Sequence, residues 1–268
     1  MASASATTSS DAIARRFTAL RERGRRALVP YLTAGHPDPV RSLETLRAVE
    51  EAGADILEVG VPFSDPMADG PVIQASSQIA LAAGMTLDRT LDLVSRAGLS
   101  IPVVLFSYLN PVLHAGEGLL ERAAQAGVHG LLVTDLPVGG DPALESRLSA
   151  GPLAFVRLVA PTTPRERMAE IARHGSGFVY LISRLGVTGA RTELPPELPR
   201  TVSLLREVCD LPICVGFGIS APDQARAVAR MADGVVVGSA LVRAAEDGPE
   251  AAATLVRSLR AAMDEVAP

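Results

Sequence analysis

Two acidic residues, Glu58 and Asp69, stand in settings where a carboxyl group can do chemistry. Glu58 lies in the middle of a short apolar run, residues 56–60, which reads ILEVG. Burial disfavours the ionised form of a carboxyl group, so such a residue is either paired with a partner or suited to proton transfer near neutral pH. From the residues alone both interpretations stand: a structural carboxylate inside the protein, or a general acid and base in an apolar pocket. The acid-rich loop that follows favours catalysis.

Asp69 follows Glu58 by eleven residues, in a loop rich in proline and glycine that reads VPFSDPMADGP. One interpretation is that Asp69 only caps the helix that begins near Gly70 and Pro71. The other is that its carboxylate accepts a hydrogen bond from a ring N–H and stabilises positive charge that develops on that ring. The residue types by themselves do not decide between the two.

Glycines near the end of the chain indicate a third chemical feature, a site for a phosphate group. Gly218 lies in the run VGFGIS, and Gly238 and Ser239 follow a later apolar run. Glycine lets the backbone approach an anion closely, and the N–H groups that open a helix point towards it. Gly189 belongs to a further glycine turn and is a candidate for the same cradle. The alternative is that these glycines merely turn the chain.

The elements that position these residues alternate between apolar runs and amphipathic segments along most of the chain. The predicted strands are Ala27–Leu32, Ile56–Gly60, Ile101–Ser107, Gly130–Thr134, Phe155–Val159, Phe178–Ile182, Pro212–Gly216 and Gly234–Gly238. The predicted helices are Asp11–Arg26, Val40–Glu51, Pro71–Ala82, Thr86–Ala97, Glu117–Ala126, Pro142–Ala150, Thr163–His174, one that ends near Cys209, Pro222–Met231 and Pro249–Val266.

This order predicts an α/β protein with one closed parallel barrel, a (β/α)8 or TIM barrel, rather than an open sheet. The first helix carries Ile13, Phe17 and Leu20 on one stripe and is expected to close the bottom of the barrel. Residues 1–10 are expected to be a disordered tail, and residues 11–268 a single catalytic domain. In such barrels the chemistry lies at the carboxyl ends of the strands, where Glu58 and the glycine turns fall.

Composition limits the classes of partner. The formal net charge of −5 argues against nucleic acid, and no apolar run approaches the roughly 20 residues that a membrane helix needs. Cys209 and Cys214 are spaced for neither a zinc site nor a redox pair, and are expected to fill the core of a cytoplasmic protein. The four histidines do not cluster and are expected at the surface or in turns. We therefore expect no metal and no cofactor.

Several motifs in order make the chain resemble the tryptophan synthase α subunit family. They are LEVGVPFSDPMADGPVIQ, with PYLTAGHPD before it and VTDLP, YLISRLGVTGAR and VGFGIS after it. The resemblance implies retro-aldol cleavage of indole-3-glycerol phosphate to indole and glyceraldehyde 3-phosphate. It also implies that Glu58 is the general acid and base and that Asp69 binds the indole nitrogen.

The resemblance extends to the residues around these two acids. Gly189, Gly218, Gly238 and Ser239 match positions that contact the phosphate. Tyr31, Ile73 and Phe217 would supply apolar walls for the indole ring, and Tyr180 matches a tyrosine near Glu58, although it could simply fill the barrel. Tyr108 and Asp135 are expected to support the site. Thr188 lies in the long segment 185–198, expected to be a lid, and would tie the closed lid to Asp69.

The family also implies a partner, a β subunit that receives indole within an α2β2 assembly and uses it to synthesise L-tryptophan. It would dock on the loop around Ser64–Met67 and on the segment around Asn110 and Pro111. Alternatives are a free-standing lyase that releases indole, another phosphate-binding barrel such as an isomerase, or an inactive subunit that only activates its partner. The loop PFSDPMADGP argues against an unrelated isomerase, and the presence of Glu58 and Asp69 argues against an inactive subunit.

Overall fold

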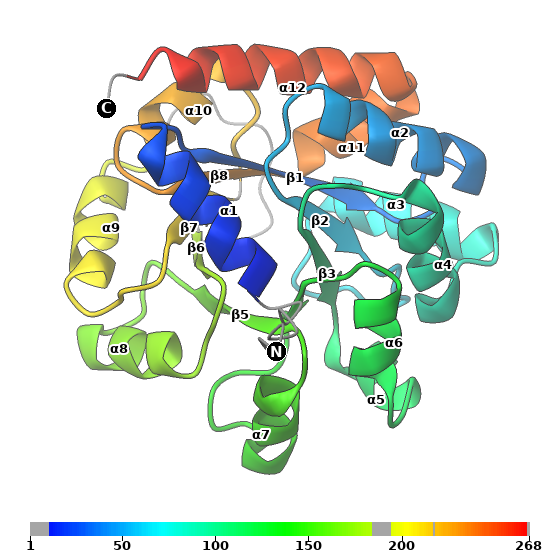
Figure 1. Cartoon of the computed structure of the whole chain (residues 1–268), viewed down its shortest axis with the longest axis horizontal. Coiled ribbons are helices and arrows are strands. Elements are labelled where there is room, and N and C mark those ends of the chain that lie inside the picture. The colour runs from blue at the N-terminus through cyan, green and yellow to red at the C-terminus, as the bar shows by residue number, and fades with distance from the viewer. Residues whose placement is uncertain (1–10, 184–193, 217, 267–268) are drawn as a thin grey trace, which may run out of the picture.

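The computed structural model describes residues 11–183, 194–216 and 218–266. Eight parallel strands close into a barrel, in which β1 pairs with both β2 and β8 (Figure 1). The strands are β1 Ala27–Thr33, β2 Leu57–Gly60, β3 Val103–Ser107, β4 Gly130–Val133, β5 Ala154–Val159, β6 Val179–Ile182, β7 Ile213–Gly216 and β8 Gly234–Val237. The predicted (β/α)8 barrel is confirmed.

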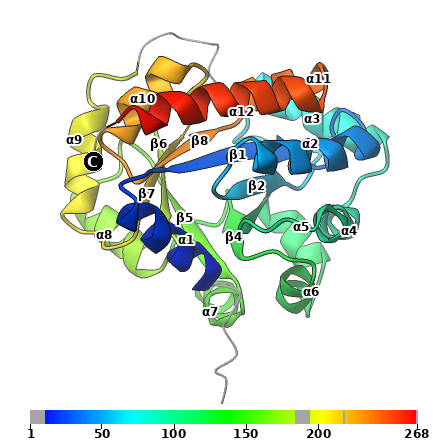
Figure 2. The same cartoon turned by 45° about the horizontal axis from the view of Figure 1, so that its top comes forward.

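Helices surround the barrel, and Figure 2 shows α12 running beside α2 on one side of it. The helices are α1 Asp11–Glu22, α2 Pro39–Glu51, α3 Pro71–Ala82, α4 Leu87–Ala97, α5 Leu109–His114, α6 Leu119–Gln125, α7 Pro142–Ala150, α8 Arg165–Arg173, α9 Leu198–Arg206, α10 Pro222–Ala229, α11 Ser239–Glu246 and α12 Pro249–Asp264. Two of them, α5 and α11, were not predicted. Within the described residues no helix is long and apolar enough to span a bilayer.

The strands are apolar on both faces because each face packs against a different layer. One cluster of buried side chains fills the inside of the barrel, with Val29, Val104 and Val236 among its members. The other lies between the strands and the outer helices, with Leu28 and Val235 among its members. Neighbouring residues of β1 and β8 therefore alternate between the two layers, as the period of a strand requires.

The first helix closes the barrel at the amino-terminal ends of the strands. Ile13, Phe17 and Leu20 are buried in the inner cluster, and the rings of Phe17 and Phe178 are 6.0 Å apart. A Cβ at Gly130, the first residue of β4, would meet Ile13 Cδ1 at 2.9 Å. The spacing of i, i+4 and i+7 places all three apolar side chains on one face of α1.

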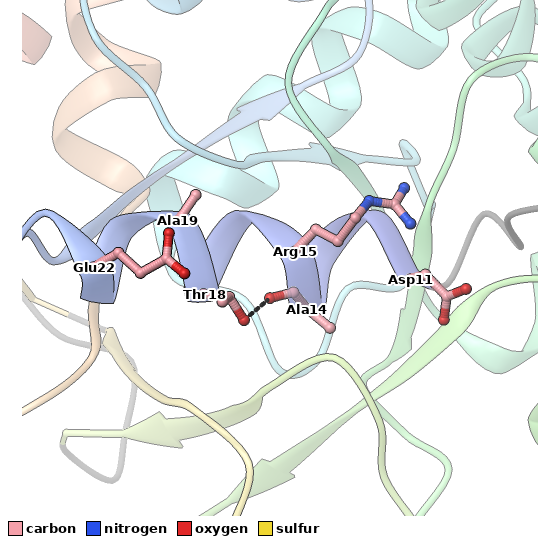
Figure 3. A pocket seen from close by; sticks show the side chains of 6 residues that line it. All are labelled: Asp11, Ala14, Arg15, Thr18, Ala19 and Glu22. Carbon is pink, nitrogen blue, oxygen red and sulfur yellow. Dashed lines mark hydrogen bonds between the residues drawn. The ribbon is translucent and has the colours of Figure 1, made fainter.

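The opposite face of α1 lines a shallow, open pocket (Figure 3). The residues that line it are Asp11, Ala14, Arg15, Thr18, Ala19 and Glu22. These short or charged side chains, together with the hydrogen bond from Thr18 Oγ1 to the Ala14 carbonyl, are typical of a solvated helix face. None of the predicted site residues that the structure describes lies in α1, so this pocket is separate from them.

A buried carboxylate connects the two ends of the chain below the barrel. Asp55 accepts hydrogen bonds from Arg16 of α1 at 2.7 Å and from Arg260 of α12 at 2.9 Å. It also accepts one from the backbone N–H of Leu28, in β1, at 2.9 Å. We call these three side chains, Asp55, Arg16 and Arg260, the terminal latch, because they hold the first and last helices to the start of the barrel.

Candidate active site

Glu58 lies in β2 with its side chain inside the barrel and is 1% exposed. In the strand register its neighbours are Tyr31 of β1 and Val104 of β3, both members of the inner cluster. Neither carboxyl oxygen has a hydrogen-bond partner among the described residues. Burial raises the pKa of Glu58 to about 8. With no cation beside it in the part of the chain that the structure describes, the carboxyl group is a proton donor or acceptor poised near neutral pH.

Asp69 ends the loop between β2 and α3 and is also buried. Its Oδ2 accepts a hydrogen bond from the hydroxyl of Tyr108 at 3.0 Å. Burial raises the pKa of Asp69 to about 6, and the hydrogen bond from Tyr108 opposes that rise. The N-cap of α3 is Gly70, with no side-chain hydrogen bond at the cap, so the interpretation of Asp69 as a helix cap is wrong.

Two tyrosines link the surroundings of these carboxyl groups. Burial raises the pKa of Tyr31 well above its usual value, and the charges of Asp69 and Glu58 raise it further. Burial also raises the pKa of Tyr180 well above its usual value, and the charges of Glu58 and Asp69 raise it further. Both rings belong to the inner cluster. The structure therefore brings Glu58, Asp69, Tyr31 and Tyr180 into one electrostatic environment at the mouth of the barrel.

Glycines make room for both tyrosine hydroxyls. A Cβ at Gly60, the last residue of β2, would lie 2.1 Å from the hydroxyl of Tyr31. A Cβ at Gly216, the last residue of β7, would lie 2.2 Å from the hydroxyl of Tyr180. Each tyrosine therefore reaches from its own strand into the space that the next strand leaves empty.

The described part of the expected phosphate site lies at the ends of β7 and β8. Gly218 has a φ of +82°, a left-handed conformation that favours glycine. Gly238 is the N-cap of α11, and the N–H groups of Leu241 and Val242 bond back to its carbonyl. The N–H groups of Ser239 and Ala240 have no acceptor within the helix, as at any helix start. They can receive an anion there.

Tyr31 joins the two halves of the site. The Cβ position of Gly238 is 3.7 Å from Tyr31 Cβ, an ordinary packing distance, and the same tyrosine reaches the space over Gly60. Its ring also meets the ring of Phe106 edge to face, at 5.2 Å and 77°. Ile73 of α3 belongs to the same inner cluster and is buried. An apolar wall thus runs between the carboxyl groups and the start of α11.

Three predicted residues, Thr188, Gly189 and Phe217, lie outside the described residues. The expected lid over residues 185–198 lies largely outside them as well. Tyr108, expected around the substrate, contacts Asp69 and stacks on Phe63, with ring centroids 5.0 Å apart. Phe63 and Phe106 escaped the sequence analysis, because an aromatic residue beside a strand end gives no signal that separates a site wall from ordinary core.

His36 lies in the turn after β1, as the expectation of surface or turn allows, with its backbone N–H bonded to the carbonyl of Thr33 at 3.2 Å. Its side chain is nevertheless buried, at 3% exposed. Its Nε2 lies 3.8 Å from Glu246 Oε1, and burial lowers its pKa. It contacts the end of α11, a helix that the sequence analysis did not include. Within the described part of the chain no group of three or more histidines, cysteines or acids is arranged to hold a metal ion.

Comparisons with known proteins agree on one family. The family model for the tryptophan synthase alpha chain matches residues 17–267. A tryptophan synthase alpha chain from Gluconacetobacter diazotrophicus is 49% identical over 243 residues, which are 89% of each chain.

Solved structures give the same result. A structure of Mycobacterium tuberculosis tryptophan synthase superposes with a TM-score of 0.87 at 37% identity, covering 94% of this chain and 97% of that one. The tryptophan synthase subunit alpha from Legionella pneumophila gives a TM-score of 0.88 at 34% identity and covers 97% of this chain and all of that one.

Proposed function

The chain belongs to the tryptophan synthase alpha chain family, and we propose that Glu58 and Asp69 carry out that family's reaction in it. The reaction cleaves indole-3-glycerol phosphate into indole and glyceraldehyde 3-phosphate. One observation carries the assignment of the two residues: burial raises both carboxyl pKa values but to different extents, to about 8 for Glu58 and about 6 for Asp69. At pH 7 Glu58 is therefore mostly neutral and Asp69 mostly ionised.

These two protonation states fit the two tasks of the cleavage. Protonated Glu58 donates its proton to C3 of the indole ring. The ring then carries a positive charge shared with its N–H, and ionised Asp69 accepts a hydrogen bond from that N–H. The bond between C3 and the side chain breaks, and its electron pair returns to the ring. The neighbouring hydroxyl becomes the aldehyde and gives its proton to the Glu58 carboxylate, so Glu58 ends as it began.

The remaining site residues take roles around this pair. Gly238 and Ser239 at the start of α11, with Gly218 after β7 and with Gly189, would bind the phosphate through backbone N–H groups. Tyr31, Ile73, Tyr180 and Phe217 would enclose the indole ring. Thr188 would close a lid over Asp69. The apolar wall between the carboxyl groups and α11 supports this orientation of the substrate, ring at Glu58 and phosphate at Ser239.

The partner is a tryptophan synthase β subunit, and we propose that it docks on the rim beside Asp69. The loop around Ser64–Met67 and helix α5 present apolar side chains there: Met67 is 82% exposed and Leu113 is 52% exposed. These two exposed side chains would be covered by the partner at that interface. Indole is apolar, so direct transfer across such an interface would limit its loss. The buried free thiols of Cys209 and Cys214 fit a cytoplasmic protein.

An assay of indole release tests the proposal. The purified chain is given indole-3-glycerol phosphate alone and then with a β subunit. We expect slow release alone and faster turnover with the β subunit. Full activity without the β subunit would indicate a free-standing lyase. No cleavage in either case, with the β subunit still stimulated, would indicate an inactive activator and would contradict the roles given to Glu58 and Asp69.

A further inference from the structure

Tyr108, which was expected to support the site, is held between β3 and the loop that carries Asp69. It directly follows β3, is the N-cap of α5 and is buried. Its ring stacks on Phe63, with centroids 5.0 Å apart and planes 29° apart. The ring is therefore held by the same loop that carries Asp69.

The hydroxyl of Tyr108 has two hydrogen bonds, both to that loop. It donates to Asp69 Oδ2 at 3.0 Å and accepts from the backbone N–H of Ala68 at 3.0 Å. A phenol has one proton to donate, so the bond from Ala68 leaves that proton committed to the carboxylate. The bond to Oδ2 fixes how the carboxylate is turned and leaves its other lone pairs for a substrate N–H. The direction of the carboxylate is therefore set by Tyr108.

Tyr108 is itself held from the next strand of the barrel. Asp135, in the loop after β4, accepts a hydrogen bond from the backbone N–H of Leu109 at 2.6 Å. The N–H of Thr134 bonds to the carbonyl of Ser107 at 3.0 Å. These bonds fix the backbone on both sides of Tyr108. A chain of contacts thus runs from Asp135 through Tyr108 to Asp69.

The charges around this chain of contacts come from several elements. Glu58 of β2, Tyr31 of β1 and Tyr180 of β6 face the same region, and Asp135 acts on Tyr108 from the other side. Burial raises the pKa of Asp69, while the Tyr108 bond lowers it. Among the described residues no cation stands beside Asp69. The Tyr108 hydroxyl is therefore the described group that favours its ionised form.

We propose that Tyr108 is a positioning residue that orients the Asp69 carboxylate and keeps it ionised, and that Asp135 holds Tyr108 in place for this. The inference rests on the function proposed above, because it acts through the role given to Asp69. It separates Tyr108 from the residues that touch the substrate and gives the loop after β4 a part in the reaction.

The Tyr108→Phe variant tests the proposal directly, because phenylalanine keeps the stack on Phe63 and removes only the hydroxyl. In the complex with a β subunit, we expect the acid limb of the pH profile of kcat/KM to move up by about one pH unit. We expect the same rise in the pKa of the Asp69 carboxyl, measured by carbon NMR and assigned with Asp69→Asn. This second readout does not depend on activity.

Asp135→Ala and Asp141→Ala form a matched pair. Asp141 accepts a hydrogen bond from Leu144 at the start of α7 at 3.0 Å, as Asp135 does from Leu109 at the start of α5. Both variants lose one such bond, but the Asp141 carboxylate makes no hydrogen bond to Tyr108 or Asp69. We expect Asp135→Ala to raise the Asp69 pKa and lower kcat, and Asp141→Ala to leave both unchanged. Equal behaviour of the two variants would contradict the role of Asp135.

A double variant separates this inference from the proposed function. If Tyr108 acts through Asp69, Tyr108→Phe has no further effect on kcat/KM in the Asp69→Asn background. An unmoved Asp69 pKa together with additive losses would overturn the inference while leaving the lyase function intact. If the wild-type complex released no indole, the proposed function would be overturned. The NMR titration would then still show whether Tyr108 controls the pKa of Asp69.

Discussion

A carboxyl group buried without a partner lowers the stability of the protein that contains it. Glu58 has a pKa of about 8 in the folded chain and an ordinary value near 4.5 when unfolded. The folded state thus holds a proton that the unfolded state releases between these two pH values. Stability contributed by Glu58 is therefore unchanged below about pH 4.5 and falls as pH rises from there to 8. At pH 7 the cost is about 3 kcal/mol.

We predict that Glu58→Gln abolishes cleavage and stabilises the fold. Glutamine has the same shape but cannot transfer a proton, so kcat is expected to fall by at least about 10³-fold. Because glutamine does not titrate, the variant escapes the cost of keeping a proton on Glu58. Urea unfolding at several pH values should show a gain of about 3 kcal/mol at pH 7 and under about 1 kcal/mol at pH 5.

Retained cleavage by Glu58→Gln would remove Glu58 from the proton-transfer role. A stability difference that stays the same from pH 5 to pH 8 would show that Glu58 is ionised in the folded state. The exposed Glu207→Gln, in a surface pair with Arg165, provides the control, for which we expect no such pH-dependent gain.

Single site residues could be predicted from the sequence where a residue type conflicted with its surroundings. A glutamate within ILEVG is such a conflict, and Glu58 was predicted for that reason. Asp69 stood beside Gly70 and Pro71, where capping was an equally good interpretation. The structure excludes the cap because Gly70 is the N-cap of α3 and has no side-chain hydrogen bond there, whereas Asp69 has a buried contact with Tyr108. The two residues of that contact are 39 positions apart, so no local pattern joins them. The roles of Glu58 and Asp69 themselves stay predictions.

Among the elements, the strand ends show how two neighbouring strands shape the site together. Tyr31 of β1 occupies the space that a Cβ at Gly60 of β2 would take, with the hydroxyl 2.1 Å and Cζ 2.6 Å from that position. Both distances are shorter than any real contact of a Cβ atom. The ring is also packed against Phe106, so it cannot swing aside without losing that contact.

We predict that Gly60→Ala destabilises the protein by about 1–3 kcal/mol, because it overpacks the inner cluster. It should also raise KM, because a displaced Tyr31 ring would enter the space proposed for the indole. Urea unfolding measures the first effect and steady-state kinetics the second.

The Gly60→Ala/Tyr31→Leu variant tests the cause. Leucine is shorter, so the added methyl group would have room, and the loss in the double variant should be at least about 1 kcal/mol smaller than the sum of the single losses. Additive losses would show that glycine is needed at position 60 for its backbone conformation, and not because a Cβ there would clash with Tyr31.

Element boundaries depended on the local signals present. The predicted bounds of α3 and α7 match the structure because Pro71 and Pro142 stand at their first positions. Helices α5 and α11 were missed because both are short and begin within two residues of the end of a strand. Helices α5 and α11 lie at the carboxyl ends of β3 and β8, respectively. The missed α11 is also why the burial of His36 was not anticipated.

For the molecule as a whole, the barrel was predictable because eight apolar runs recur with helical segments between them. Parallel strands buried on both faces occur in open doubly wound sheets and in closed barrels, and eight regular strand–helix units favour the barrel. The contact between the two ends of the chain was not predictable. Asp55, Arg16 and Arg260 are ordinary charged residues in sequence, and 205 positions separate Asp55 from Arg260. Only the closed barrel brings α1 and α12 to the same place.

The last prediction is that the terminal latch contributes to the stability of the entire barrel. Asp55 and Arg260 are almost fully buried, with side chains 2% and 8% exposed, whereas Arg16 remains about one-third exposed. Removing one member of a buried ion pair leaves the other charge without compensation. We expect Asp55→Ala to lower the free energy of unfolding by about 2 kcal/mol, because the Leu28 N–H loses its acceptor and Arg260 loses its buried carboxylate partner. Arg260 keeps its contacts with the Arg26 carbonyl and with Asp264, which limit the loss.

Urea unfolding compares Asp55→Ala with Glu207→Ala. The comparison separates the loss of the buried Asp55 pair from the loss of an ordinary surface ion pair. Glu207 pairs with Arg165 at 3.3 Å, but both side chains are more than half exposed, so its removal should change stability by no more than about 0.5 kcal/mol. Amide hydrogen exchange should also show faster exchange in α1 and α12 of Asp55→Ala than in α7, which has no contact with the latch. Equal stability of the two variants would mean that the packing of Ile13, Phe17 and Leu20 alone holds α1 in the barrel, and that Asp55 only fills its own hydrogen bonds.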